Sequence, residues 1–191
     1  MDTASDGRSR ERLFQIQDSL QPKITRDRAL AGLNEIFRGG TVPEPSPDGF
    51  KRGEFVTMSM NRPSDAAART IASLYMPWLG KSFDREAGTG RNVLKPGAKT
   101  PMSIIWRNHA PEIERADRIE AFPFRTRVAA GEVDPDLQVL KIDYDFEANP
   151  GFLIRRILDE LVQIDEGLYL GKILFRTKRG WRPIGFFSLH E

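Results

Sequence analysis

Lys172 is the strongest single candidate for chemistry in this sequence, and the run that contains Lys81 is a second candidate. Lys81 lies in the run Trp78-Leu79-Gly80-Lys81-Ser82-Phe83, directly after a proline that ends a predicted helix. Lys172 shares one face of a predicted strand with three leucines. An ammonium group is costly to bury unless an acceptor meets it. Lys172 therefore predicts either a rim residue that reaches water or a cation facing the acid group of a bound molecule. The run from Trp78 to Phe83 predicts either a helix-to-strand corner with Trp78 packed in the core or part of a binding site.

A third candidate combines charged and aromatic side chains on neighbouring predicted strands. Asp143 and Tyr144 lie on one of them, and Phe124 and Arg125 lie on another. Oppositely charged pairs across a sheet usually decorate its exterior, so both a surface role and a ligand-orienting role stay open. In an enzyme, Asp143 and Lys172 would be the expected acid and base, with pKa values shifted by burial.

These residue types favour a pocket lined by aromatic side chains, with one or two polar groups that orient a ligand. At least three of the aromatic residues should line a common interior. No catalytic residue is assigned, and no cofactor or metal is expected. The predicted ligand-binding residues are Trp78, Lys81, Trp106, Phe124, Arg125, Asp143, Tyr144, Tyr169 and Lys172.

The sequence lacks the residues that several other kinds of chemistry require. The sequence has no cysteine and two histidines without metal-ligand spacing, which excludes thiolate chemistry and argues against a histidine metal site. A phosphate-binding loop needs a glycine five residues before Gly80, and position 75 is Tyr. No Gly-x-Ser-x-Gly motif is present, which argues against a hydrolase of that type.

Composition indicates one globular domain. The 191 residues carry 29 basic and 27 acidic side chains, a net charge of +2, and the signs are interspersed, so we expect no nucleic-acid partner. No apolar run is long enough for a membrane span, and the polar N-terminus resembles no signal peptide, so a cytoplasmic protein is expected. We expect a disordered tail over 1–8 and a single domain over 9–191.

The periodicity of apolar residues predicts helices first and strands later. Helices are predicted over 9–20, 25–38 and 65–76, and another begins at Asn149-Pro150 with Ile154, Ile157, Leu158 and Leu161 on its buried face. Strands are predicted over 53–60, 102–107, 122–128 and 140–146, followed by a hairpin of 169–176 and 181–189. This order predicts a mainly β protein, a small antiparallel β-barrel that is closed or nearly so. A cone-shaped sheet wrapped around a helix is the alternative.

Three blocks of sequence resemble the GXWXG-domain family and its companion domain of unknown function. They are Phe37-Arg38-Gly39-Gly40-Thr41-Val42-Pro43 with Pro47-Asp48-Gly49, the run from Trp78 to Phe83, and Tyr169-Leu170-Gly171-Lys172 with Phe186-Phe187-Ser188-Leu189. Phe37 stands where the family has its namesake tryptophan. The resemblance implies a lipocalin-like barrel with a lipophilic ligand, and it implies no catalytic residues.

The function predicted from the sequence is intracellular binding of a small hydrophobic molecule, which could be acidic and lipid-like. The alternative is a cofactor-free isomerase or cyclase that uses an acid or base in the pocket. A nucleic-acid or protein-interaction domain would need a basic stripe or an aromatic platform with interleaved cations, and the sequence has neither.

Overall fold

The computed structural model describes residues 11–13, 15, 23–58, 78–96, 113–114, 117–151 and 153–191. In this part of the chain, eight strands form a closed antiparallel barrel in the order β3-β2-β1-β9-β8-β7-β6-β5, and pairing of β3 with β5 closes it. The strands are β1 (Gly49–Met58), β2 (Trp78–Asp84), β3 (Thr89–Leu94), β5 (Ile119–Ala130), β6 (Gln138–Asp143), β7 (Ile157–Asp165), β8 (Leu168–Thr177) and β9 (Gly180–His190). The short β4 (Ile113–Glu114) pairs with β5 outside the ring.

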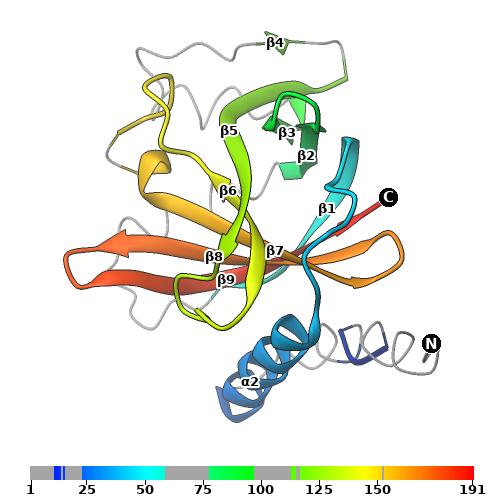
Figure 1. The fold of residues 1–191 in the computed structure, drawn as a ribbon, viewed down its shortest axis with the longest axis vertical. Coiled ribbons are helices and arrows are strands. Elements are labelled where there is room, and N and C mark those ends of the chain that lie inside the picture. Colours follow the sequence, from blue (N-terminus) through cyan, green and yellow to red (C-terminus); the bar gives the residue numbers. More distant parts are fainter. Residues whose placement is uncertain are drawn as a thin grey trace.

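The barrel has one core inside and a second core on part of its outer wall. The inner core is formed by aromatic and aliphatic side chains from every strand of the ring except β1, and by Leu153 and Ile154 of the β6–β7 connection. The outer core lies where α2 (Lys23–Gly39) packs against β7 and β8. Figure 1 shows this helix beside the barrel, with its axis outside the ring of strands.

The packing of α2 follows from its sequence. Leu33, Ile36 and Phe37 lie at helical spacing and are buried, so one stripe of the helix faces the sheet. Phe37 meets Phe186 of β9 edge to face, with ring centroids 6.3 Å apart. Two backbone hydrogen bonds between Thr41 and Gln163 then join the end of the helix to β7. The outer face of β7 and β8 is therefore buried as deeply as their inner face.

Much of the predicted architecture is confirmed. The chain forms an antiparallel, closed, lipocalin-like barrel, and the helix predicted over 25–38 is α2. The strands predicted over 122–128 and 140–146 are β5 and β6, and the predicted hairpin is β8–β9, which turns between Thr177 and Gly180. The hairpin of β2 and β3 was not predicted, because the sequence indicated a corner in the run from Trp78 to Phe83 and no strand over β3.

The helix predicted from Asn149-Pro150 is wrong. The segment forms a single 3-10 turn, η2 (Ile154–Arg156), and then strand β7. β7 lies between β6 and β8, so the strand predicted over 140–146 is separated from the last hairpin by a strand that the sequence did not indicate. Both faces of β7 are buried, and a strand with two buried faces has no alternation of apolar and polar residues to distinguish it from a helix.

Other predicted elements lie outside the described residues. These are the helix over 65–76, the strand over 102–107 with Trp106, the tail over 1–8 and most of the helix over 9–20, of which residues 11–13 and 15 are helical. Among the helices that the structure describes, none has the length and apolarity needed to cross a membrane.

Candidate functional site inside the barrel

Lys81 lies in the centre of the barrel, where its Nζ is 2.9 Å from Oδ2 of Asp159. Both side chains are 0% exposed. Lys81 belongs to β2 and Asp159 to β7, and these strands are four steps apart around the ring in either direction, through β1, β9 and β8 or through β3, β5 and β6. The ion pair therefore spans the interior and joins opposite walls of the barrel.

Two further acceptors surround the ammonium group of Lys81. Oδ1 of Asn92 lies 3.1 Å from Nζ, and the hydroxyl oxygen of Tyr144 also accepts from it. Asn92 is the cross-strand partner of Lys81, and Tyr144 directly follows β6. Because a lysine ammonium has three donors, Asn92, Tyr144 and Asp159 satisfy all of them.

The remaining donors are engaged as well. The indole N–H of Trp78 donates to Asn92 Oδ1 at 3.0 Å, and the Tyr144 hydroxyl donates to Asp159 Oδ2 at 3.0 Å. The amide nitrogen of Asn92 donates to the Tyr144 hydroxyl oxygen at 3.1 Å and to the carbonyl of Phe122 at 3.5 Å. We call these five residues, Trp78, Lys81, Asn92, Tyr144 and Asp159, the Lys81 cluster.

Four aromatic rings surround Lys81 Nζ. The ring centroids of Phe187, Tyr144, Trp78 and Phe124 lie 4.9, 5.1, 5.5 and 5.5 Å away. A cation at this distance from an aromatic face is attracted to the ring, more strongly when water is excluded. Gly171 leaves the room that this arrangement needs, because a β-carbon there would overlap with the ring of Phe187.

Burial governs the ionisation of the central pair. Desolvation lowers the pKa of the Lys81 ammonium, and the attraction of Asp159 opposes that shift. Desolvation likewise raises the pKa of the Asp159 carboxyl, and Lys81 and Tyr144 oppose it. Both groups are shifted towards their neutral forms, so a proton passes more easily between them than between an exposed lysine and aspartate.

A cavity of about 20 Å³ lies beside the cluster. Its walls are Trp78, Asn92, Leu94, Phe122, Tyr144, Ile154 and Ile157. Such a volume holds about one water molecule, whereas ligand pockets measure roughly 300–1,000 Å³. The cavity is thus much smaller than the ligand-sized pocket that the sequence indicated.

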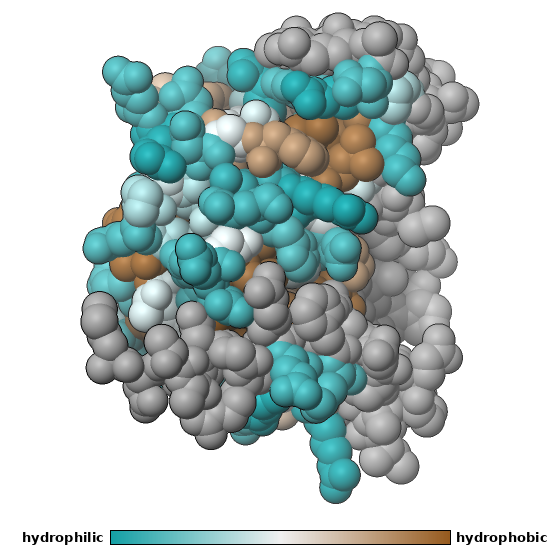
Figure 2. Space-filling view, turned by 90° about the vertical axis from the view of Figure 1, so that its right-hand side faces the viewer, coloured by the Kyte–Doolittle hydropathy of each residue, from teal (hydrophilic) through white to brown (hydrophobic). Residues whose placement is uncertain are grey.

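A larger hollow of about 430 Å³ lies on the outer side of the wall formed by β1, β2 and β3. It is lined by Phe50, Arg52, Gly53, Trp78, Leu79, Val93, Lys95, Asp117 and Arg118. On the side of the molecule that carries β1 and the C-terminal end, Figure 2 shows hydrophobic surface bordered by hydrophilic residues. Trp78 lines both the outer hollow and the inner cavity, so its indole forms part of the wall between them.

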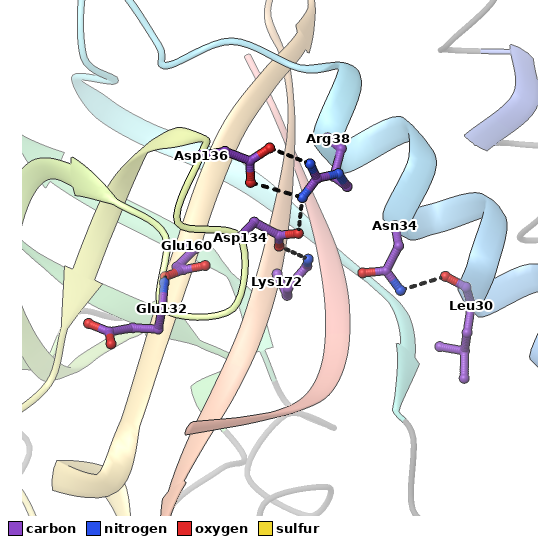
Figure 3. A network of polar contacts seen from close by, with 8 residues as sticks. All are labelled: Leu30, Asn34, Arg38, Glu132, Asp134, Asp136, Glu160 and Lys172. Atoms are coloured by element: carbon purple, nitrogen blue, oxygen red, sulfur yellow. Dashed lines mark hydrogen bonds and ion pairs between the residues drawn. The ribbon is translucent and has the colours of Figure 1, made fainter. Parts of the chain in front are cut away.

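Lys172 is buried but lies outside the barrel interior. It is on the face of β8 that α2 covers, and its Nζ is 2.5 Å from Oδ2 of Asp134 and 4.2 Å from the ring centroid of Phe37. Asp134 and Asp136 also bind Arg38 of α2, as Figure 3 shows. Lys172 is therefore neither a rim residue nor a ligand anchor in the barrel: it belongs to a network that fastens α2 to the β5–β6 loop.

Of the other predicted site residues, some lie inside the barrel and some lie on its exterior. Tyr169 is in the inner core, but its hydroxyl reaches Glu191 at 3.5 Å rather than the Lys81 cluster. Arg125 is exposed and lies over the ring of Phe146, and Asp143 is half-exposed and 4.0 Å from Arg127. Arg125 and Asp143 face each other across β5 and β6 on the exterior, so their predicted place in the pocket is wrong.

Four predicted residues do come together: Trp78, Lys81, Phe124 and Tyr144. Trp106 lies outside the described residues. Asp159 and Asn92 were missed. The available signal for Asp159 was a pair of acidic residues, Asp159-Glu160, inside the apolar run from Ile157 to Ile164, and a buried carboxylate requires a partner. No group of three or more potential metal ligands occurs among the described residues.

The fold defines the class of protein: a lipocalin-like antiparallel β-barrel with a charged cluster at its centre. No protein-family model matches the sequence, and no curated protein is significantly similar to it. The crystal structure of a protein from Thermomonospora curvata is similar, with a TM-score of 0.53 and 17% identity over 96% of this chain and 98% of that chain. A likeness at this identity supports the fold alone, and the resemblance to the GXWXG-domain family stays a prediction.

Proposed function

We propose that the protein binds a small, mainly apolar molecule inside the barrel, next to the Lys81 cluster. The observation that carries this proposal is the chemistry of the cavity wall, since the cavity in this state has room for about one water molecule. Leu94, Phe122, Ile154 and Ile157 make its wall almost entirely apolar, and Asn92 and Tyr144 also line it. An apolar wall with a few convergent polar groups is typical of small-molecule sites.

The central ion pair supports a role beyond stability. Desolvating two charges costs several kcal/mol per ion, and well-packed apolar residues of similar volume are often as stabilising or more so. A barrel of this size can be filled by apolar side chains alone. Lys81 and Asp159 instead hold Asn92 and Tyr144 in fixed orientations at the cavity, which is useful to a binding site.

A ligand larger than one water must widen the cavity. Trp78 is the side chain that separates it from the outer hollow of about 430 Å³. The ring of Trp78 packs on Gly53, where a β-carbon would overlap with it. We propose that displacement of this ring joins the two spaces and admits the ligand.

Titration calorimetry with p-xylene tests the proposal. Ile154→Ala removes part of the cavity wall and should tighten binding severalfold relative to the native chain. Ile36→Ala makes the same change in the outer core and should leave the affinity unchanged. If p-xylene binds neither the native chain nor Ile154→Ala, or binds Ile36→Ala equally more tightly, the proposal is wrong.

The enzyme alternative is supported by one observation, the hydrogen-bonded chain of Lys81, Tyr144 and Asp159, along which a proton can move. It would use these residues rather than Asp143 and Lys172, which lie outside the interior. A proton-transfer enzyme would accelerate deuterium exchange at the α-carbon of acetophenone in D₂O, and Lys81→Met would abolish the acceleration. A rate equal to that of buffer would contradict this alternative.

A further inference from the structure

The hydrogen bonds of the Lys81 cluster restrict the kind of ligand that it can accept. Each donor of the cluster already has an acceptor: three for the Lys81 ammonium, one for the Trp78 indole, two for the Asn92 amide and one for the Tyr144 hydroxyl. A carboxylate or phosphate that entered the barrel would find no donor here without breaking one of these bonds. Desolvating an anion without donors is costly.

One acceptor in the cluster is open. Oδ1 of Asp159 is buried and has no hydrogen-bond partner among the described residues, while Oδ2 of the same carboxylate accepts from Lys81 and Tyr144. If the shared proton moves from Lys81 to Asp159, it moves along the contact to Oδ2, so Oδ1 remains an acceptor in either state. A buried acceptor without a partner costs about 1–3 kcal/mol.

Asp159 does not line the cavity, but it lies next to residues that do. Asp159 follows Ile157 by two residues on β7, which places both side chains on the inward face, and Ile157 lines the cavity. Tyr144 lines the cavity too, and its hydroxyl is 3.0 Å from the Asp159 carboxylate.

Resting on the proposed function, we propose that the ligand is a neutral apolar molecule with a hydrogen-bond donor, such as an alcohol or a phenol, which donates to Oδ1 of Asp159. This assignment differs from the acidic ligand considered from the sequence. It changes the role of the cluster as well: Lys81 neutralises Asp159 and occupies its other oxygen, and Asp159 selects the ligand.

Three ligands of similar shape test the selectivity on the native chain: p-xylene, p-cresol and 4-methylbenzoate. A hydrogen bond to a charged group contributes about 1.5–3 kcal/mol, so p-cresol should bind about tenfold or more tightly than p-xylene. The benzoate should bind more weakly than p-xylene. If p-cresol shows no advantage over p-xylene, or if the benzoate binds most tightly, the inference is overturned and the proposed function stands. If none of the three binds, the proposed function fails and the inference fails with it.

Two double variants assign the effect to Asp159. Lys81→Met with Asp159→Leu removes the acceptor without leaving a buried charge, and it should bind p-cresol and p-xylene equally. Lys172→Met with Asp134→Leu removes a buried pair outside the barrel and should keep the preference for p-cresol. Circular dichroism checks that each variant is folded. If a variant does not fold, the ligand series on the native chain tests the inference by itself. A preference for p-cresol that persists without Asp159 overturns the assignment.

Discussion

Lys81 and Asp159 approach within 2.9 Å from strands on opposite sides of the barrel. Strand pairing alone cannot bring these two residues together, because they are not neighbours in any ladder. Their contact exists only when the ring of strands is closed. Formation of the ion pair therefore requires closure of the barrel.

The first prediction concerns this pair. Lys81→Met leaves Asp159 buried without a cation, and breaking a buried pair in this way costs about 3–5 kcal/mol. Lys81→Met combined with Asp159→Leu removes both charges and should recover most of that loss. Urea unfolding of both variants measures the difference. A double variant as unstable as Lys81→Met alone would contradict this account of the pair.

The second prediction concerns pH and the contact of α2 with the β5–β6 loop. Burial raises the pKa of the Asp134 carboxyl, but hydrogen bonds from Lys172 and Arg38 outweigh it, and the resulting pKa is below the ordinary value. The unfolded chain therefore takes up the proton first, and the stabilisation is present above about pH 4 and lost as the pH falls further.

Urea unfolding between pH 7 and pH 3 measures this loss. Asp134→Asn should be less stable than the native chain at pH 7, and the difference should shrink as the pH falls. Glu86→Gln changes an exposed carboxylate and should follow the native chain at every pH. A difference that stays constant down to pH 3 would be evidence against the role of Asp134.

The third prediction concerns the aromatic rings around Lys81. A β-carbon at position 171 would overlap with the ring of Phe187, so Gly171→Ala must move that ring. Overpacking of this kind costs about 1–3 kcal/mol. Gly39→Ala, at the end of α2, adds a β-carbon where no atom lies within 4 Å and should change stability by less than about 0.5 kcal/mol. Equal unfolding midpoints for the two variants would show that the ring has room to shift.

The fourth prediction concerns Trp78 as the wall between the cavity and the outer hollow. Trp78→Ala should join the two spaces and speed the exchange of p-xylene, which NMR line shapes measure. Trp181→Ala, in the β8–β9 hairpin, removes a tryptophan that lines neither space and should leave the exchange rate unchanged. An exchange rate unaltered by Trp78→Ala would place the access route elsewhere.

Lys81 and Lys172 show how far the sequence could predict the site. Both were candidate site residues, Lys172 as a cation among leucines and Lys81 as part of the run from Trp78 to Phe83, and both are buried and paired. The sequence could not show which face of the barrel each would occupy, because α2 buries the outer face of β8 as fully as the barrel buries the inner face. Period-two alternation identifies a strand face, but it does not tell an inner core from an outer one.

Asp159 was missed because its strand was not predicted. Its strand is buried on both faces, so no alternation of apolar and polar residues identified β7, and the segment was predicted to be a helix. Asn92 was missed because no strand was predicted over β3. The fold class was predictable because β5, β6 and the β8–β9 hairpin carry clear signals. Asn92 and Asp159 were not predictable, because they come from the two strands without such a signal, β3 and β7.

An NMR titration with p-xylene tests the central claim most directly, because it locates the ligand within the protein. The account predicts saturable shifts for the methyl groups of Ile154 and Ile157 and for the indole N–H of Trp78, which surround the cavity. The methyl groups of Ile36 and Val139, in the outer core, should not shift. If the cavity methyl groups stay unchanged up to the solubility limit of p-xylene, or shift no more than those of the outer core, the barrel interior is not a binding site.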